Sequence, residues 1–450
     1  MRDILVTAII LGLLLKAVRS PRTGAYLWVW LAMMIPYRLT YGFARTLPFA
    51  YATALITLIG LLFSKERRPF PFNSITVVQL LFIFWMTFTC LFAMNASELV
   101  LAQWIVVLKI HGMLFATMML IRGREQLERL VWIVTLSISF YGAKGGLFTL
   151  VTGGGERVWG PPASVIEGNN ELGVALVLVM PFLYYLYHIS VRRWLRYGLI
   201  ACIGLVAFGI LGTQSRGALL ALLAMAFLLG LKGKHPVRMS VLLMVLVGSA
   251  IAFMPDRWSN RMDTIQSYQQ DSSAMSRIYT WTTLWNLAKD RPIVGAGFRT
   301  DNSEIYARYA PQGVGDFRFG TAWVAHSIYF QALGEHGFPG LTLYLLLGVV
   351  TWRKASQISK RTANMPEYRE WAPLLMRMVQ VSLVGFAVGG AFLTLVHFDL
   401  PYYIVSYVVL LDATLNEKEK RSKNGRLSGT TGSVEGHFHV TNANTTTRTV

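Results

Sequence analysis

Three consecutive stretches, NELGVALVLVMPFLYYLYHI (170–189), SVRRWLR (190–196) and YGLIACIGLVAFGILGT (197–213), decide the fold of this 450-residue chain. The first and third are almost wholly apolar, whereas the second is rich in arginine. A helix crosses the hydrocarbon layer of a membrane in ~20 apolar residues, and cytoplasmic loops accumulate Lys and Arg. The pattern therefore predicts two antiparallel membrane helices joined by a cytoplasmic loop.

The composition of the whole chain agrees with this interpretation. Hydrophobic residues make up 54% of the chain and charged residues 14%, and the mean hydropathy is +0.46. Lys and Arg exceed Asp and Glu by 42 to 23, a net charge of +19 that in a soluble protein would suggest nucleic acid. Here the orientation of membrane helices accounts for the surplus, so no nucleic-acid partner is expected.

Apolar stretches recur along the chain and predict an all-α polytopic membrane protein. The first two, 4–17 and 24–37, are short enough to be half-helices or a re-entrant pair, so we expect about 12 transmembrane helices. The other candidate spans are 49–64, 74–94, 100–121, 130–152, 170–189, 197–213, 217–231, 239–254, 338–352, 375–395 and 400–414.

Basic clusters follow alternate spans, which predicts the side of each connection. The segments 1–254 and 326–415 then hold the membrane helices, and the long polar segment 255–325 lies on the non-cytoplasmic face. The segment 416–450, rich in Ser, Thr, Gly and Asn without an apolar period, is predicted to be a disordered cytoplasmic tail. The clusters are 65–68, 122–129, 192–196, 232–238 and 353–361.

The polar segment 255–325 is predicted to contain a helix and a turn. Between Met275 and Ala288 apolar residues recur at helical spacing, which predicts an amphipathic helix on the membrane surface that begins near Arg277. Gly295 and Gly297 form a turn rather than a dinucleotide loop, because no strand precedes them and no third glycine follows at the required spacing.

Arg216 stands in a very short predicted outer turn, at the start of the next apolar helix. It is either an interfacial arginine whose guanidinium reaches the membrane surface, or part of an anion site. A helix N-terminus and a guanidinium together suit a phosphate group.

Lys109 and Lys144 each fall inside an apolar span, roughly 12 to 14 Å from its outer end. A charge within the membrane costs at least ~2.5 kcal/mol on insertion scales, so such residues are candidates for function. Their common depth suggests a shared polar cavity, although either lysine could instead reach the interface or pair structurally.

Three histidines, His326, His336 and His397, remain as candidates for the outer face once the cytoplasmic and tail histidines are set aside. Near His326 the sequence shows no paired carboxylates, Asp-x-Asp metal motif, nucleophile elbow or P-loop. A lone interfacial histidine is usually a hydrogen-bonded structural residue, so His326 requires further support.

A set of short motifs supports a function for His326, because their order and spacing resemble those of the O-antigen ligase and polymerase superfamily of bacterial envelopes. The chain is particularly similar to lipopolysaccharide O-antigen ligases and to the O-glycosylation ligases of that group. The resemblance covers most of residues 150–400, and the first 150 residues match only as hydrophobic helices. The motifs are Ser215–Gly217, Arg277 with Trp281, Pro292–Gly297, His326–Gln331, Glu335 and Gly337.

The resemblance implies a metal- and cofactor-independent, inverting glycosyltransferase with a GT-C-like architecture. Its donor would be a glycan on undecaprenyl diphosphate, its acceptor a hydroxyl of the lipid A core, and its location the periplasmic face of the bacterial inner membrane among membrane lipids.

The resemblance also implies roles for individual residues. Arg216 and Arg277 match the family's essential arginines, which stabilise the diphosphate, and His326 matches its essential histidine, a general base. Secondary candidates for the diphosphate or the first sugars are Arg157, Lys109 and Lys144, and Glu335 either orients the histidine or caps structure.

Other functions stay open. An O-antigen polymerase or a protein O-oligosaccharyltransferase would use the same donor site, so these residues do not separate the three activities. A lipid-linked glycan transporter would predict related halves with interrupted helices. The sequence shows no internal repeat and one large polar insertion, which favours the enzyme.

Overall fold

The computed structural model describes residues 1–232, 248, 272–312 and 322–431, and these residues form helices and loops without a strand. The predicted all-α class is therefore confirmed. The helices are α1 (Arg2–Arg19), α2 (Pro21–Met34), α3 (Phe49–Phe63), α4 (Ser74–Thr89), α5 (Ser97–Leu120), α6 (Arg124–Val151), α7 (Asn169–Ile189), α8 (Arg193–Gly212), α9 (Arg216–Lys232), α12 (Ser272–Asp290), α13 (Ser303–Tyr309), α14 (Ile328–Ala363), α15 (Ala372–Gly389) and α16 (Asp399–Thr431).

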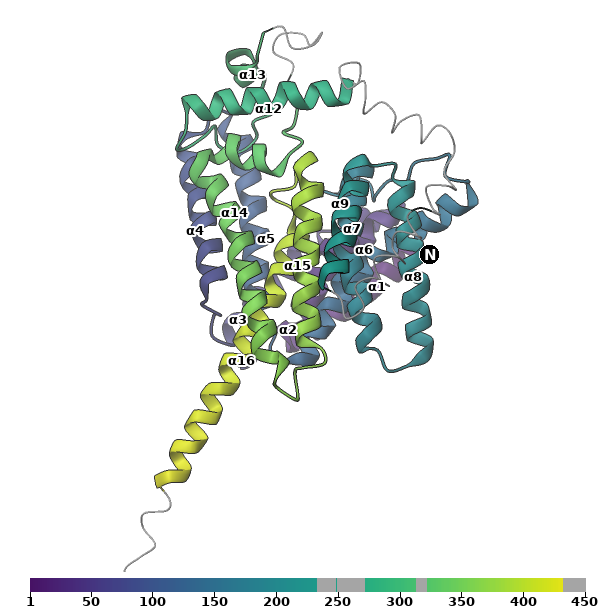
Figure 1. Cartoon of the computed structure of the whole chain (residues 1–450), viewed down its shortest axis with the longest axis vertical. Helices are drawn as coiled ribbons and strands as arrows, with labels where there is room; N and C mark the ends of the chain where they lie inside the picture. Colours follow the sequence, from purple (N-terminus) through teal and green to yellow (C-terminus); the bar gives the residue numbers. More distant parts are fainter. Residues whose placement is uncertain (233–247, 249–271, 313–321, 432–450) are drawn as a thin grey trace, which may run out of the picture.

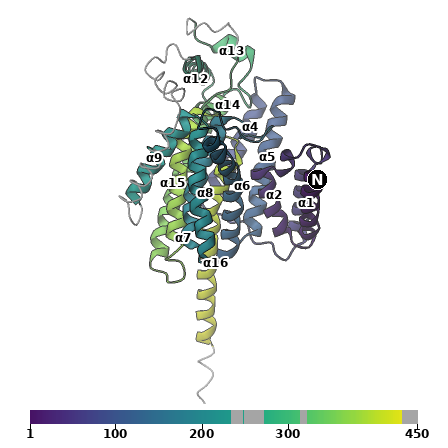
Figure 2. The same ribbon diagram turned by 90° about the vertical axis from the view of Figure 1, so that its right-hand side faces the viewer.

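Most of these helices run side by side in one bundle, and α12 lies across one end of it (Figure 1). We call this end of the bundle the α12 end. The α14–α15 connection and the far end of α16 lie at the opposite end, as the view turned by 90° also shows (Figure 2). The helix predicted between Met275 and Ala288 is present as α12, which begins at Ser272, while its place on the membrane surface stays a prediction.

Seven of the described helical segments are long and apolar enough to cross a membrane, so the chain is a multi-pass membrane protein. The helices α3 and α9 are apolar but shorter. The expected total of about 12 stays a prediction, and the candidate span 239–254 lies outside the described residues. The seven are Ser74–Phe92, Ser97–Leu120, Arg124–Val151, Asn169–Ile189, Arg193–Gly212, Ile328–Ala363 and Ala372–Phe392.

Helix α7 lies at the centre of the bundle. Every residue from Leu172 to Leu183 is buried, and α7 packs against α6, α8, α9 and α15. A helix that is apolar on all sides is stable only when other helices surround it. The stretch at 170–189 is therefore the core around which the other spans are arranged.

Helix α14 begins at Ile328, nearly three turns earlier than the predicted span 338–352. Its first turns, from Ile328 to His336, contain polar side chains and so lack the hydropathy of a lipid-facing span. They are separated from the rest of the helix by a break at Gly337, whose φ of 67° is left-handed.

Helix α16 also differs from the prediction, because it continues past Asn416 to Thr431 through part of the segment expected to be disordered. Ion pairs to neighbouring elements hold this extension. Glu417 accepts a hydrogen bond from Arg122 Nε at 3.0 Å, and Lys418 forms an ion pair with Glu367. Residues 432–450 lie outside the described residues.

The segment Pro292–Gly297 docks onto the broken part of α14 by backbone hydrogen bonds. Ala296 and Gly297 donate to the carbonyls of Gly334 and Glu335 at 2.9 and 2.8 Å, and Phe338 N–H donates to the Pro292 carbonyl at 2.8 Å. Gly295 and Gly297 have φ of 60° and 75°, so they form a tight turn, as the sequence suggests.

We expect Gly295→Ala to lower the unfolding temperature of the detergent-solubilised protein. An added Cβ would lie 2.5 Å from the Gly334 carbonyl oxygen, and the left-handed backbone alone costs an L-residue ~1–2 kcal/mol. Gly204→Ala in α8 is the matched control, because nothing lies within 4 Å of its added Cβ. Equal thermal shifts for the two variants would contradict the docking described above.

Candidate functional site

His326 lies at the α12 end, immediately before α14, in a strained backbone conformation. Its φ of 45° is left-handed, and its N–H donates to Thr394 Oγ1 at 2.8 Å. A non-glycine residue held in this region is sustained by its surroundings and is often found at functional sites. Thr394, in the segment 393–398 between α15 and α16, supplies part of that support.

Two contacts of Trp281 hold helix α12 against the residues that flank His326. Trp281 Nε1 donates to the Ala325 carbonyl at 3.0 Å, and its ring stacks on Phe330 with centroids 5.3 Å apart. Arg277 precedes Trp281 by four residues and therefore shares its face of the helix. The structure thus brings Arg277 and His326, two of the predicted site residues, into electrostatic range.

The pKa of His326 is lowered from its ordinary value, first because burial disfavours the charged imidazolium and second because of the positive charge of Arg277. The imidazole is consequently neutral at neutral pH, with a lone pair on one ring nitrogen. A neutral, half-buried histidine beside a fixed cation is suited to accept a proton.

Arg216 begins α9, where the preceding turn is capped. Ser215 Oγ accepts from the Ala218 N–H at 3.2 Å, and Gln214 takes a φ of 52° to reverse the chain. The next residue, Gly217, packs against Phe392, since a Cβ there would lie 3.5 Å from its ring.

Phe392 connects this turn to the α12 face. Its ring centroid is 6.4 Å from that of Trp281. The start of α9, the Arg277 face of α12 and the start of α14 therefore meet around two aromatic rings.

Arg157 reaches the same turn from the loop after α6. Its Nε donates to Gln214 Oε1 at 3.2 Å, and Gln214 Nε2 donates in turn to the Gly154 carbonyl at 3.3 Å. The structure thus places Arg157 beside the turn that carries Arg216.

Lys109 and Lys144 have different surroundings, because Lys109 lines a cavity whose lining does not include Lys144. Lys109 Nζ donates to Tyr51 Oη at 2.8 Å and lines a cavity of about 380 Å³ between α2, α3 and α5. Lys144 is exposed, because α6 packs on α8 through another face, where Gly146 meets the Leu205 carbonyl.

Glu335 is buried, and its direct partner is His397 rather than His326. Its Oε2 lies 2.9 Å from His397 Nε2, and its Oε1 accepts from the Arg299 N–H at 3.3 Å. Gln331 Nε2 lies 3.4 Å from the same carboxylate, while its Oε1 accepts from the Val396 N–H at 3.0 Å.

This network fixes the segment 393–398 and, through Thr394, the backbone of His326. Sequence reasoning included Gln331 only as the end of a motif, and it missed Thr394 and the pairing of Glu335 with His397. The only signal was that His397 is one of the three histidines expected on the outer face.

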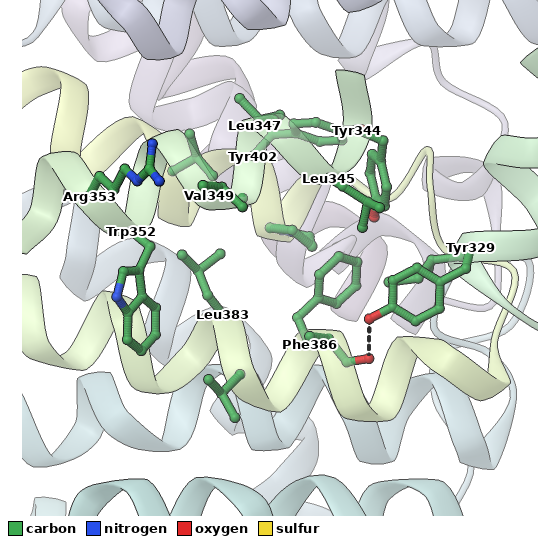
Figure 3. A pocket seen from close by; sticks show the side chains of 16 residues that line it. Tyr329, Tyr344, Leu345, Leu347, Val349, Trp352, Arg353, Leu383, Phe386 and Tyr402 are labelled. Carbon is green, nitrogen blue, oxygen red and sulfur yellow. Dashed lines mark hydrogen bonds between the residues drawn. The ribbon is translucent and has the colours of Figure 1, made fainter. Parts of the chain in front are cut away.

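Two hollows flank the site. A cavity of about 620 Å³ is lined by polar groups that include Arg299, Asp301, Glu335 and His397. An apolar groove of about 390 Å³ runs between α14, α15 and α16 from Tyr329, three residues after His326, to Arg353 (Figure 3). Tyr329 Oη donates to the Ala387 carbonyl at 2.7 Å at the end of the groove nearest His326 in sequence (Figure 3).

Two family models match the chain. Residues 200–345 match the family described as O-antigen ligase, and residues 1–190 match a family of unknown function (DUF5935). No curated protein matches the chain. The first match includes Arg216, Arg277, His326 and Glu335, and it confirms the resemblance drawn from the short motifs.

We expect Thr394→Val to lower the free energy of unfolding by ~1–3 kcal/mol, because the His326 N–H then loses its acceptor in a partly buried position. Thr394→Ser keeps the hydroxyl and should stay close to wild type. Thermal unfolding of both variants in detergent measures the difference, and indistinguishable midpoints would show that this hydrogen bond does not support His326.

Proposed function

From the O-antigen ligase family domain that the chain carries at residues 200–345, we propose that the protein is a lipid-linked glycan ligase. It transfers an oligosaccharide or polysaccharide from undecaprenyl diphosphate to a hydroxyl of the lipid A core. The reaction takes place at the periplasmic face of the bacterial inner membrane, the side to which we assign the α12 end. The observation that carries this proposal is the neutral His326 beside Arg277, two residues before the first residue that lines an apolar groove.

The apolar groove is suited to the isoprenoid tail of the donor. Its walls are Leu, Val, Phe and Tyr side chains, and it follows α14 and α15 along the bundle (Figure 3). A tail in this groove would bring the attached diphosphate to the level of Tyr329, next to His326. The donor thus remains in the membrane while its sugar meets water.

The diphosphate would be bound by arginines. Arg216 combines a guanidinium with the N-terminus of α9, and Arg277 faces the same cluster from α12. Arg157 donates to Gln214, two residues before Arg216, and is proposed as a secondary ligand of the diphosphate. Lys109 and Lys144 are left out of the proposed donor site, because Lys109 is bound to Tyr51 in a separate cavity and Lys144 is exposed on α6.

In the proposed step an acceptor hydroxyl oxygen attacks the anomeric carbon of the donor sugar. The hydroxyl proton moves to the free ring nitrogen of His326, and the bond from the anomeric carbon to the diphosphate oxygen breaks with its electron pair on oxygen. Direct displacement inverts the anomeric centre. Arg216 and Arg277 stabilise the negative charge that grows on the leaving diphosphate, the part that a metal ion plays in other phosphate chemistry.

We expect His326→Ala to lower glycan transfer by ~10²- to 10⁴-fold, the usual contribution of a general base. Arg216→Gln and Arg277→Gln should also lose most activity, because the leaving group is no longer stabilised. Arg308→Gln is the matched control, since Arg308 is an exposed arginine near α12 whose ion pair with Asp290 is solvated. Each variant is expressed in a deletion strain, and surface glycan and lipid-linked glycan are resolved on gels.

The pattern of the accumulated glycan separates the related activities. A ligase defect leaves polymer on the lipid carrier and removes it from lipopolysaccharide, whereas a polymerase defect removes the polymer itself. A protein O-oligosaccharyltransferase defect leaves lipopolysaccharide intact and removes glycan from protein. Normal glycan in the His326 and arginine variants would refute the catalytic assignment.

We expect the rate of transfer to fall at acidic pH, as pH drops through the lowered pKa of His326, because the protonated imidazole is no base. Arg277→Gln removes one cause of the lowering, so the acidic limb of its normalised pH profile should move to higher pH. Rates of the purified protein between pH 4.5 and 8 give both profiles. An acidic limb at the same pH in the two proteins would contradict the coupling of Arg277 to His326.

A further inference from the structure

We propose that Glu335, His336 and His397 form a binding site for one divalent transition-metal ion, with the preferences of Zn²⁺. The site lies beside the proposed transfer site and does not depend on that function. The ligand atoms of the three residues lie within 4.8 Å of one another, and all three side chains are buried. Two imidazoles and one carboxylate are an established donor set for zinc.

The hydrogen bonds of His336 leave one of its ring nitrogens available to a cation. Thr89 Oγ1 donates its single hydrogen to the Met86 carbonyl at 2.9 Å and lies 2.8 Å from His336 Nδ1. The hydroxyl must therefore accept from Nδ1–H, which leaves a lone pair on His336 Nε2.

This Nε2 is fully buried, finds no hydrogen-bond partner among the described residues and lies 3.8 Å from Glu335 Oε2. A lone pair then faces a carboxylate oxygen with no donor between them, an arrangement that is costly in a buried site. If the hydroxyl hydrogen pointed to His336 instead, Nε2–H would be too far from the carboxylate for a hydrogen bond. A cation between the two atoms accepts a lone pair from each and removes their repulsion, with Nδ1–H of His336 donating to the Thr89 hydroxyl.

The distances suit tetrahedral coordination. Ligand bonds of ~2.0–2.1 Å place neighbouring ligand atoms about 3.4 Å apart. The observed separations of Glu335 Oε2 from the Nε2 atoms of His397 and His336 are 2.9 and 3.8 Å, on either side of this value. Glu335 and His397 also line the 620 Å³ cavity, so a fourth position would face that cavity and be filled by water.

The surroundings orient the three ligands, as in natural zinc sites. Thr89, at the end of α4, fixes the ring of His336, and the Arg299 N–H and Gln331 amide hold the carboxylate. The ring of Phe298 stands edge-on to both imidazoles, with centroids 4.9 Å from His336 and 5.2 Å from His397.

A bound ion would join three parts of the chain at the α12 end: α4 through Thr89, α14, and the segment 393–398. That segment also carries Thr394, which holds the backbone of His326. The role assigned to the metal is therefore structural, and its removal should loosen the surroundings of His326.

The test is direct metal binding to the purified full-length protein in detergent, carrying a purification tag without histidine. The protein is stripped with EDTA, titrated with Zn²⁺, and analysed for metal content and unfolding temperature. We expect about one zinc per chain more in the wild type than in the double variant His336→Gln/His397→Gln, together with a higher unfolding temperature on zinc addition. His188→Gln, an exposed histidine at the end of α7, is the control and should bind as the wild type does.

Two further measurements keep the proposal open to refutation if the double variant folds poorly. Thr89→Val should weaken zinc binding about 10- to 100-fold, because it removes only the group that orients His336. Wild type loaded with Co²⁺ should show the visible absorption of a tetrahedral site. Equal zinc content in the wild type and the double variant, or no visible bands with Co²⁺, would mean that Glu335 and His397 are only a hydrogen-bonded pair, and would overturn the proposal.

Discussion

The break of α14 at Gly337 is the constraint on which the α12 end depends. Backbone groups near the membrane must be paired within the protein, so the groups that the break exposes need partners. The segment Pro292–Gly297 provides them, on the carbonyls of Gly334 and Glu335 and the N–H of Phe338. This docking positions α12 across the end of the bundle. There Trp281 donates to the carbonyl of Ala325, the residue before His326.

The same break divides α14 into two parts with different chemistry. Its first turns carry Gln331, Glu335 and His336, which are buried among polar partners, and the longer part continues as a membrane span that forms one wall of the apolar groove. Polar and apolar surfaces therefore meet at His326. An amphiphilic donor, with a charged diphosphate between a sugar and a hydrocarbon tail, has the same division, which is why the geometry supports the proposed ligase.

The sequence predicted much of the fold because lipid imposes simple rules. The apolar run of α7, the helix α12 and the turn at Gly295 and Gly297 all follow from local composition. It did not predict the first turns of α14, since their polar residues are stabilised only by contacts with the segments 292–299 and 393–398. The extension of α16 was missed for a similar reason, because its ion pairs join it to distant helices.

The site residues also divide into those that local sequence motifs predicted and those that depend on contacts between distant segments. Short motifs identified Arg216, Arg277 and His326, which the structure gathers around Trp281 and Phe392. Depth alone suggested a common cavity for Lys109 and Lys144, but depth does not specify which side of a helix a residue faces. The pairing of Glu335 with His397, 62 residues apart, is a tertiary contact without a local pattern.

In the proposed site, arginines bind the donor diphosphate while His326 acts only on the acceptor proton. Equilibrium binding of undecaprenyl diphosphate to the purified protein tests it most directly, in wild type and in the variants Arg216→Gln, Arg277→Gln and His326→Ala. We expect each arginine variant to bind at least ~10-fold more weakly, a loss of about 1.4 kcal/mol, and His326→Ala to bind as tightly as wild type. Equal affinity in all four proteins would contradict it.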